Sequence, residues 1–436
     1  MAWDKPLSGV ISRRILLAGV YALTVAALID PADRIFHLKI PSFLLVGLVW
    51  VGRWGITRPI ISARMWMAVI GFALLIPTLW TVIGLTHYGV HNGEIDFGTA
   101  KSFLFLLLVP VLISESIDLS SLITRTSMLV ALLTILMVIV SLISPAGFDL
   151  LYAFSLSKQN AIVAESRDLI GVGIGMFYYK TSALLVFPFA HYCNCLASPV
   201  RGKARSLAFC IIFGAALLFS GARANFIGEM LIAGCFITRY LVRRLGWASA
   251  VLIAITASGI FAATMAPRLT DPEETSNSIK LGHIQSYEDL FNAHPSILLW
   301  GEGAEIAFYS KGYGDWTTVT ELTYLELIRI FGVPMTLFFF YSLLWLAARL
   351  FRRGRIGLGV AYTTYLLISA SNPLLISSTG FIALCAVWKE AEAPSAMDSA
   401  FYLFEPAYRL PERLFAKWMV LIAKTGSVTS AGARSN

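Results

Sequence analysis

Apolar stretches long enough to cross a lipid bilayer recur along almost the whole of this 436-residue chain. A transmembrane helix needs about 20 mostly apolar residues, because the hydrocarbon core is about 30 Å thick and its backbone groups must be hydrogen-bonded within the protein. Twelve runs meet or approach this length: 15–30, 40–53, 65–85, 102–115, 127–144, 181–198, 206–222, 224–242, 247–266, 322–348, 356–371 and 373–388. Because four of them are short, we expect eleven to thirteen spans. The sequence therefore predicts an all-α polytopic membrane protein with about twelve transmembrane helices.

The composition excludes several other classes of protein. Hydrophobic residues make up 57% of the chain and charged residues 14%, whereas a typical soluble chain has about 25% charged residues. A disordered chain would be far less apolar. The net charge of +8 is compatible with nucleic-acid binding, but in a membrane protein the distribution of Lys and Arg usually reports orientation. Nucleic acid is therefore not an expected partner.

The cationic residues predict which side of the membrane each connection faces. If the N-terminus is cytoplasmic, the cytoplasmic connections carry seventeen Lys and Arg residues and the external ones ten. By the positive-inside rule, both termini are then cytoplasmic. Two long segments, 145–180 and 267–321, fall on the external face, where we expect the chemistry. We predict one transmembrane domain, 1–388, and a cytoplasmic tail, 389–436, in which the segment 411–424 suits an interfacial amphipathic helix.

Arg223 lies in a very short external turn between two apolar runs. A charged residue at the rim of a membrane span is costly and is a candidate for a functional site. Its planar guanidinium suits phosphate better than a lysine does. Lys158, Arg167 and Lys180, in the segment 145–180, could supplement Arg223 in holding a diphosphate, although snorkelling explains Lys180 equally well. The alternative is that Arg223 only closes the turn by snorkelling or ion pairing.

Charged residues also gather where the second external segment re-enters the membrane as a helix. Glu326 and Arg329 are three residues apart and share a helix face, which predicts an ion pair between them. Thr318 and Glu321 have the spacing of a capping box, so Glu321 is either a helix cap or an accessible base.

The external segment 267–321 has the composition of a sugar-binding surface. It contains nine acidic residues and only Arg268, Lys280 and Lys311 as cations, together with aromatic residues such as Tyr309. The Gly-Glu-Gly sequence around Glu302 lacks the Lys-Ser/Thr of a nucleotide-binding loop, so ATP is not implied. The chain also lacks the carboxylate cluster that usually holds a divalent ion, so we expect neither metal nor cofactor.

Three pieces of sequence, in this order, resemble the O-antigen polymerase and ligase superfamily of multispanning glycosyltransferases. They are the Ser-Gly-Ala-Arg223-Ala turn, the loop sequence His294-Pro-Ser-Ile-Leu-Leu-Trp-Gly-Glu-Gly, and Thr-Glu321-Leu-Thr-Tyr-Leu-Glu326-Leu-Ile-Arg329-Ile-Phe-Gly-Val-Pro. The resemblance implies a GT-C-like fold in the bacterial inner membrane, with a periplasmic cavity where undecaprenyl-diphosphate-linked saccharides are joined. It also implies that Arg223 contacts the lipid diphosphate. The ligase branch usually has a His where this chain has Thr320-Glu321, which favours the polymerase branch over a lipid A-core ligase.

The expected reaction needs no cofactor, because the lipid diphosphate is already an activated leaving group. Arginines would neutralise the charge that grows on the diphosphate, and a carboxylate would accept the proton of the attacking hydroxyl. We expect Arg223 and Glu321 to be catalytic, with Glu302 and Glu326 as the other candidates for the base. We expect the substrate to contact Arg268, Arg329, Glu302, Glu326, His294, Arg167, Tyr309 and Tyr324.

The expected partners are the lipid-linked oligosaccharide and membrane lipids, with a chain-length regulator protein as a further candidate. Two alternatives remain open: a ligase acting on lipid A core, and a lipid-linked oligosaccharide flippase. A carrier usually has midplane charges and two related halves, and neither is evident in this sequence.

Overall fold

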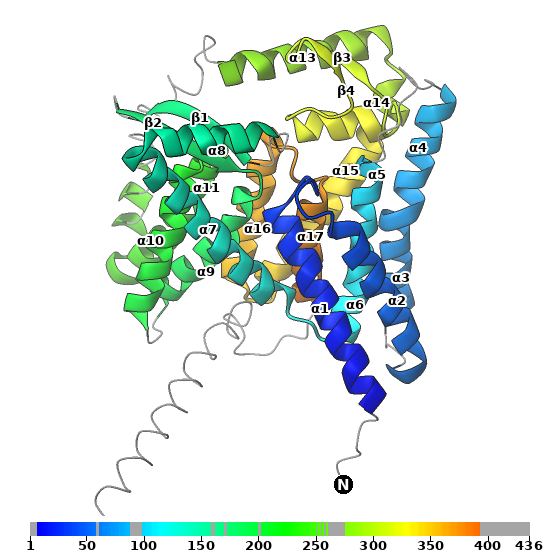
Figure 1. Ribbon diagram of the computed structural model, residues 1–436, viewed down its shortest axis with the longest axis horizontal. Coiled ribbons are helices and arrows are strands. Elements are labelled where there is room, and N and C mark those ends of the chain that lie inside the picture. Colours follow the sequence, from blue (N-terminus) through cyan, green and yellow to red (C-terminus); the bar gives the residue numbers. More distant parts are fainter. Residues whose placement is uncertain are drawn as a thin grey trace, which may run out of the picture.

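The computed structural model describes residues 7–57, 61–87, 98–157, 162–169, 172–198, 202–249, 251–253, 255–256, 259 and 275–392. Within these ranges most helices run side by side in one bundle (Figure 1). Four predictions lie outside the described residues: Lys158, Arg268, most of the span 247–266, and the tail beyond residue 392 with its amphipathic helix.

The regular elements described in the first part of the chain are all helices. Its elements are α1 (Leu7–Ile29), α2 (Lys39–Thr57), α3 (Ala63–Ile70), the π-helix η1 (Gly71–Leu75), α4 (Ile76–His87), α5 (Gly98–Phe103), the 3-10 helix η3 (Leu104–Leu107), α6 (Leu108–Ser114), α7 (Leu119–Ile143) and α8 (Pro145–Ser157).

The second part adds two short hairpins to the helices. It comprises β1 (Ile162–Leu169), β2 (Val172–Tyr179), the 3-10 helix η4 (Ser182–Leu185), α9 (Val186–Ala197), α10 (Lys203–Phe219), α11 (Arg223–Leu245), α13 (Thr275–Ala293), α14 (Ile297–Trp300), β3 (Phe308–Ser310), β4 (Asp315–Thr317), α15 (Thr323–Arg352), α16 (Ile356–Ile368), the 3-10 helix η5 (Ser369–Ser371) and α17 (Ser378–Glu392). Each hairpin is an antiparallel pair, β1 with β2 and β3 with β4.

The helices fall where the apolar runs predict them. Described helices overlap all twelve runs, including 247–266, where residues 247–249, 251–253, 255–256 and 259 are helical. Five of them are long and apolar enough to cross a membrane: Val10–Ile29, Ala63–Thr86, Leu119–Ile143, Arg223–Leu245 and Thr323–Arg352. Three shorter apolar helices cover Gly98–Ser114, Ser182–Ala197 and Ile356–Ser371. The structure is therefore that of an all-α membrane protein, while the count of about twelve spans is not confirmed.

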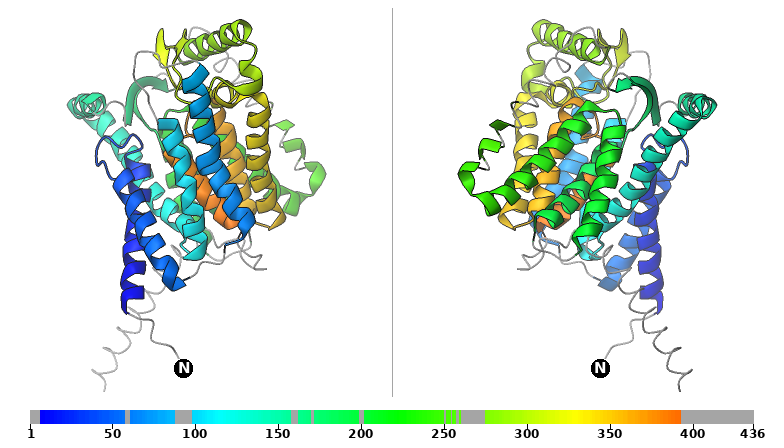
Figure 2. Two further views of the ribbon diagram at one scale, coloured as in Figure 1. Left: turned by 90° about the vertical axis from the view of Figure 1, so that its right-hand side faces the viewer. Right: turned by 90° about the vertical axis from the view of Figure 1, so that its left-hand side faces the viewer.

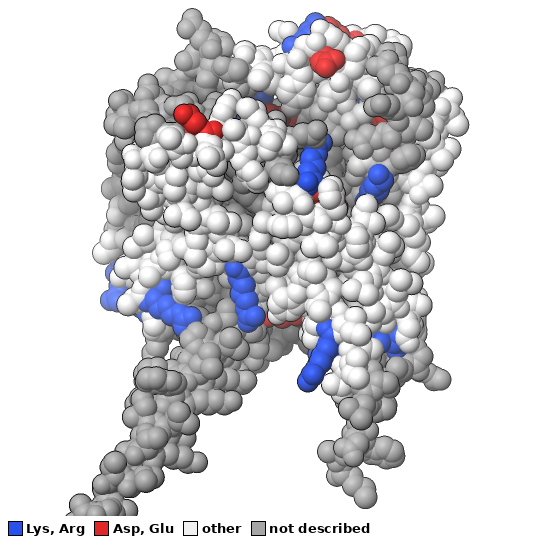
Figure 3. Space-filling view, viewed as in Figure 1, with Lys and Arg blue, Asp and Glu red and all other residues white. Residues whose placement is uncertain are grey.

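The described parts of the two predicted external segments lie together at one end of the bundle. The helix α8, the β1–β2 hairpin, α13 and the β3–β4 hairpin all occupy this end, and α1 begins at the opposite end (Figure 1). The helix α13 lies across the bundle rather than along it (Figure 2). In the space-filling view, a broad belt of uncharged side chains separates the Lys and Arg residues near the start of α1 from the charged residues at the other end (Figure 3). We call the end that carries α13 the external end.

The second external segment is more ordered than its prediction as a loop. Residues 275–293 form the 19-residue helix α13, and residues 308–317 form the β3–β4 hairpin. Segment 145–180 likewise contains α8 and the β1–β2 hairpin. The helix α13 is polar and the other elements are short, so they lack the continuous apolar run that marks a membrane helix.

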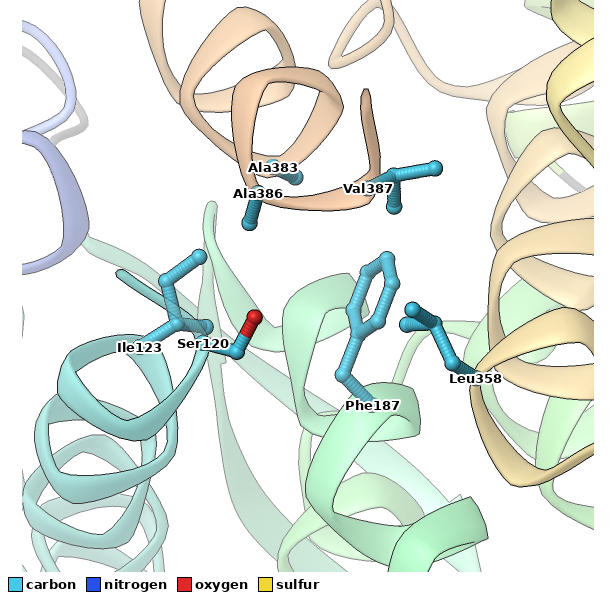
Figure 4. Close-up of a pocket in the computed structure, with 7 residues that line it drawn as sticks. All are labelled: Ser120, Ile123, Phe187, Leu358, Ala383, Ala386 and Val387. Atoms are coloured by element: carbon cyan, nitrogen blue, oxygen red, sulfur yellow. The ribbon is translucent and has the colours of Figure 1, made fainter. Parts of the chain in front are cut away.

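The described helices form an apolar cavity of about 250 Å³ lined by residues such as Phe72, Phe339 and Leu384, and elsewhere the bundle is closely packed. A gap of about 10 Å³ lies between α7, α9, α16 and α17, lined by Ser120, Ile123, Phe187, Leu358, Ala383, Ala386 and Val387 (Figure 4). A gap of this size holds at most about one water molecule. It is therefore no place for a substrate, and the polar residues at the external end are the better candidates for a site.

Candidate functional site

The helix α15 is interrupted near its start, and this break holds the external segment in place. Gly332 has φ 74° and ψ 166°, outside the helical region. The carbonyl of Ile330 cannot bond to Pro334, which has no N–H, and instead accepts from the amide of Gly303 at 3.1 Å. A Cβ on Gly332 would lie 2.5 Å from the carbonyl oxygen of Leu299. Only glycine fits this crossing, which fixes the segment after α14 against α15.

The side chain of Arg329 is fully buried just before this break. Its guanidinium lies 2.7 Å from Glu302 and 2.6 Å from Glu326. It also donates to the carbonyls of Ile306 and Thr318, both at 2.9 Å. The ion pair predicted from the spacing of Glu326 and Arg329 is thus confirmed, and Glu302 joins it from the external segment.

The helix α13 is tied to the same network through Tyr287. Its hydroxyl donates to Glu326 at 2.5 Å and lies 2.6 Å from the hydroxyl of Thr320. Burial, followed by the negative charge of Glu326, raises the pKa of Tyr287 well above its ordinary value. We call Arg329, Glu302, Glu326, Tyr287 and Thr320 the buried network. Every guanidinium nitrogen of Arg329 donates a hydrogen bond within the protein. The buried network therefore holds α13 and α15 together.

Glu321 lies immediately outside the buried network and does not cap α15. The N-cap residue is Leu322, and no side chain caps it. The capping-box prediction is therefore wrong: the helix begins further along, and the Thr318 carbonyl is bonded to Arg329. The half-buried carboxylate of Glu321 makes no hydrogen bond or ion pair with any residue in the described ranges. It remains open to a ligand, as a base requires.

Glu321 interacts electrostatically with Lys280 and Tyr313, and Tyr313 packs against His283. Burial raises the pKa of the Glu321 carboxyl above its ordinary value, and the positive charge of Lys280 opposes this rise. Burial, followed by the charge of Glu321, raises the pKa of Tyr313 to about 12. The ring of Tyr313 packs edge-on against His283, with centroids 4.5 Å apart. We call Glu321, Lys280, His283 and Tyr313 the Glu321 cluster.

His283 is fully buried between α13 and the β3–β4 hairpin. Its Nδ1 lies 2.7 Å from the hydroxyl of Ser310, while Nε2 has no hydrogen-bond partner among the described residues. Burial lowers the pKa of His283, and the nearby charge of Glu326 opposes this effect. His283 therefore holds the hairpin to α13 as a neutral ring.

Arg223 is the first residue of α11, and its side chain contacts α13. Its Nη1 donates to the Oδ1 of Asn277 at 3.4 Å. Asn277 and Lys280 are three residues apart and so share a face of α13, separated by about 4.5 Å along its axis. Arg223 therefore contacts α13 three residues before Lys280, whose charge acts on Glu321.

The remaining predicted substrate residues are more scattered. His294 is exposed just after α13. Tyr309 is 50% exposed and packs against Trp316. The hydroxyl of Tyr324 donates to the Leu366 carbonyl inside the bundle. Arg167 lies in β1 opposite Ile174, and only its backbone is described. The structure does not bring these four together with Glu321.

Sequence reasoning missed the roles of His283 and Tyr287. A signal was present, because Ile279, His283 and Tyr287 recur every four residues, as on one face of a helix. Thr320 gave no such signal, since its partner Tyr287 is 33 residues away.

The class of this protein is defined by its fold and its site, because comparison with known proteins identifies no family. No family model matches the chain, and a search of curated proteins finds no match. Within the described ranges, no three His, Cys, Asp or Glu side chains gather in a way that could hold a metal ion. The protein is an all-α protein of membrane type with a polar, titratable site at one end of its bundle.

Proposed function

We propose that the protein is a polysaccharide polymerase of the bacterial inner membrane. It joins oligosaccharide repeat units carried on undecaprenyl diphosphate, at the periplasmic face, to make an O-antigen or an exopolysaccharide. The observation that carries this proposal is the position of α13, which contacts Arg223 through Asn277 and carries Lys280, whose charge acts on Glu321. A cation suited to phosphate and an open carboxylate are the two groups that glycosyl transfer from a lipid diphosphate needs.

Each group has a defined part in the reaction. The acceptor hydroxyl attacks the anomeric carbon of the donor sugar, and the bond from that carbon to the diphosphate oxygen breaks. Glu321 accepts the proton of the hydroxyl, a role that typically contributes about 10²–10⁴-fold to the rate. Arg223 neutralises the charge that grows on the departing lipid diphosphate.

The buried network and the aromatic surface support this reaction without touching the reacting atoms. The buried network keeps α13 and the start of α15 together, and so keeps Glu321 beside Lys280. Tyr309 and Trp316 are half exposed on the β3–β4 hairpin, where their rings can pack against sugars.

The distribution of charge supports the orientation in this proposal. The Arg residues near the start of α1 and near the ends of α11 and α15 fall on the end opposite α13. By the positive-inside rule, that end is cytoplasmic and the site is periplasmic.

Deleting the gene and analysing surface polysaccharide on a gel tests the proposal. Loss of a polymerase leaves a single capped repeat unit, whereas loss of a ligase removes every capped form, and loss of a flippase leaves the units trapped inside the cell. We expect the first pattern, reversed by the wild-type gene. Either of the other two patterns contradicts a polymerase.

A further inference from the structure

Lys180 is a half-buried cation without a partner at the external end. It follows β2 and precedes η4, and it makes no hydrogen bond or ion pair with a described residue. The next residue, Thr181, donates to the carbonyl of Leu28 at 2.6 Å, which fixes this turn against the end of α1. Burial lowers the pKa of Lys180, and the like charge of Arg34 lowers it further. A half-buried ammonium beside another cation is costly unless an anion accompanies it.

A fully buried asparagine connects this turn to the turn that carries Arg223. Asn225 donates from Nδ2 to the hydroxyls of Ser182, at 2.7 Å, and Ser220, at 2.9 Å. Ser182 is two residues after Lys180, and Asn225 is two residues after Arg223. The two cations therefore lie on turns that one hydrogen bond holds together.

The side-chain oxygen of Asn225 accepts no hydrogen bond from a described residue. Its Oδ1 is buried and has no hydrogen-bond partner within the described ranges. An unmade hydrogen bond at a buried acceptor is costly, so such an atom usually meets a bound water or a ligand donor. A hydrated phosphate at these turns would supply a negative charge for Lys180 and a water that can donate to Oδ1.

We propose that Lys180 and Arg223 bind one phosphate-containing headgroup, with Asn225 and Ser182 setting the spacing between the two cations. This inference rests on the proposed function, in which Arg223 meets the diphosphate of the lipid carrier, and adds Lys180 as a second contact. The same chemistry is offered by an anionic phospholipid, so the test must separate these two sources.

Binding to the purified full-length protein in detergent tests the site directly. The probes are farnesyl diphosphate, as an isoprenyl diphosphate, and phosphatidylglycerol, each titrated by calorimetry. We expect Lys180→Gln and Arg223→Gln each to weaken binding of farnesyl diphosphate about tenfold or more, because each removes a charge-assisted hydrogen bond. Lys180→Arg keeps the charge and should retain most of the affinity. Lys101→Gln removes the same charge from α5 and should change nothing.

Several outcomes decide the proposal. It is overturned if Lys180→Gln binds farnesyl diphosphate as the wild type does, or if the wild type binds neither probe. Equal melting temperatures for Lys180→Gln and the wild type exclude misfolding as the cause of a loss. Binding of both probes with equal dependence on Lys180 supports a general lipid-phosphate site, and binding of the diphosphate alone supports the lipid carrier. Lys180-dependent binding by a protein that joins no repeat units supports this inference and contradicts the polymerase.

Discussion

The carboxylate of Glu302 lies 2.7 Å from the guanidinium of Arg329, and the two buried side chains join the segment after α14 to the helix α15. Glu326 holds the same guanidinium from the other side, at 2.6 Å. One cation is thus shared by two buried carboxylates. Because neither carboxylate can regain water without opening the structure, the network should behave as a single structural unit.

Replacing Arg329 with Met should destabilise the protein strongly. Removing one partner of a buried ion pair typically costs about 3–5 kcal/mol, because an uncompensated charge stays buried. Arg329→Lys should also be destabilising, since an ammonium cannot reproduce the bonds of the planar fork. Thermal unfolding of the purified protein in detergent measures both effects.

The matched control is Lys311→Met, which removes an exposed ion pair with Asp289 at the same end. Exposed pairs contribute about 0–1 kcal/mol, so its melting temperature should stay near that of the wild type. If Arg329→Met melted no lower than this control, the buried network would not hold the external segment.

Gly332→Ala should destabilise the break in α15. Its positive φ disfavours any side chain, and the new Cβ would approach the carbonyl oxygen of Leu299 to 2.5 Å. Gly234→Ala is the control, because Gly234 lies inside α11 with nothing within 4 Å of an added Cβ, and Ala favours a helix. We expect a lower melting temperature for the first variant and an equal or higher one for the second. Equal melting of both variants would contradict this account of the break.

The rate of glycosyl transfer should depend on pH through Glu321. A base works only when deprotonated, and burial raises the pKa of this carboxyl, so the rate should rise with pH up to a value above the ordinary glutamate range. The charge of Lys280 lowers that pKa. Lys280→Gln should therefore move the rising limb of the pH profile to higher pH, whereas a shift to lower pH would contradict the pairing.

The same shift predicts how Glu321→Gln affects stability. A carboxyl whose pKa is raised by folding favours the protonated form, and the charged form costs stability as the pH rises through that pKa. Gln resembles the protonated form. Glu321→Gln should thus melt no lower than the wild type at neutral pH while the rate falls about 10²–10⁴-fold, and a marked loss of stability would point to a structural role.

The sequence predicted those features that depend on local pattern. The apolar runs placed the long helices, and the spacing of Glu326 and Arg329 predicted their ion pair. Glu302 could not be recognised as the third member, because it is 27 residues from Arg329 and only the folded chain brings them together. The capping box failed at Glu321 for a related reason: the Thr318 carbonyl is bonded to Arg329, which the local spacing does not reveal.

The central claim is that Arg223 and Glu321 transfer glycan from a lipid diphosphate at the external end. The most direct test reconstitutes the full-length protein in liposomes with undecaprenyl-diphosphate-linked repeat units and measures oligosaccharide length together with released undecaprenyl diphosphate. We predict long chains and stoichiometric release with the wild type and with Lys101→Gln, and almost none with Arg223→Gln or Glu321→Gln. Wild-type chain length and release in either of those two variants would contradict the account.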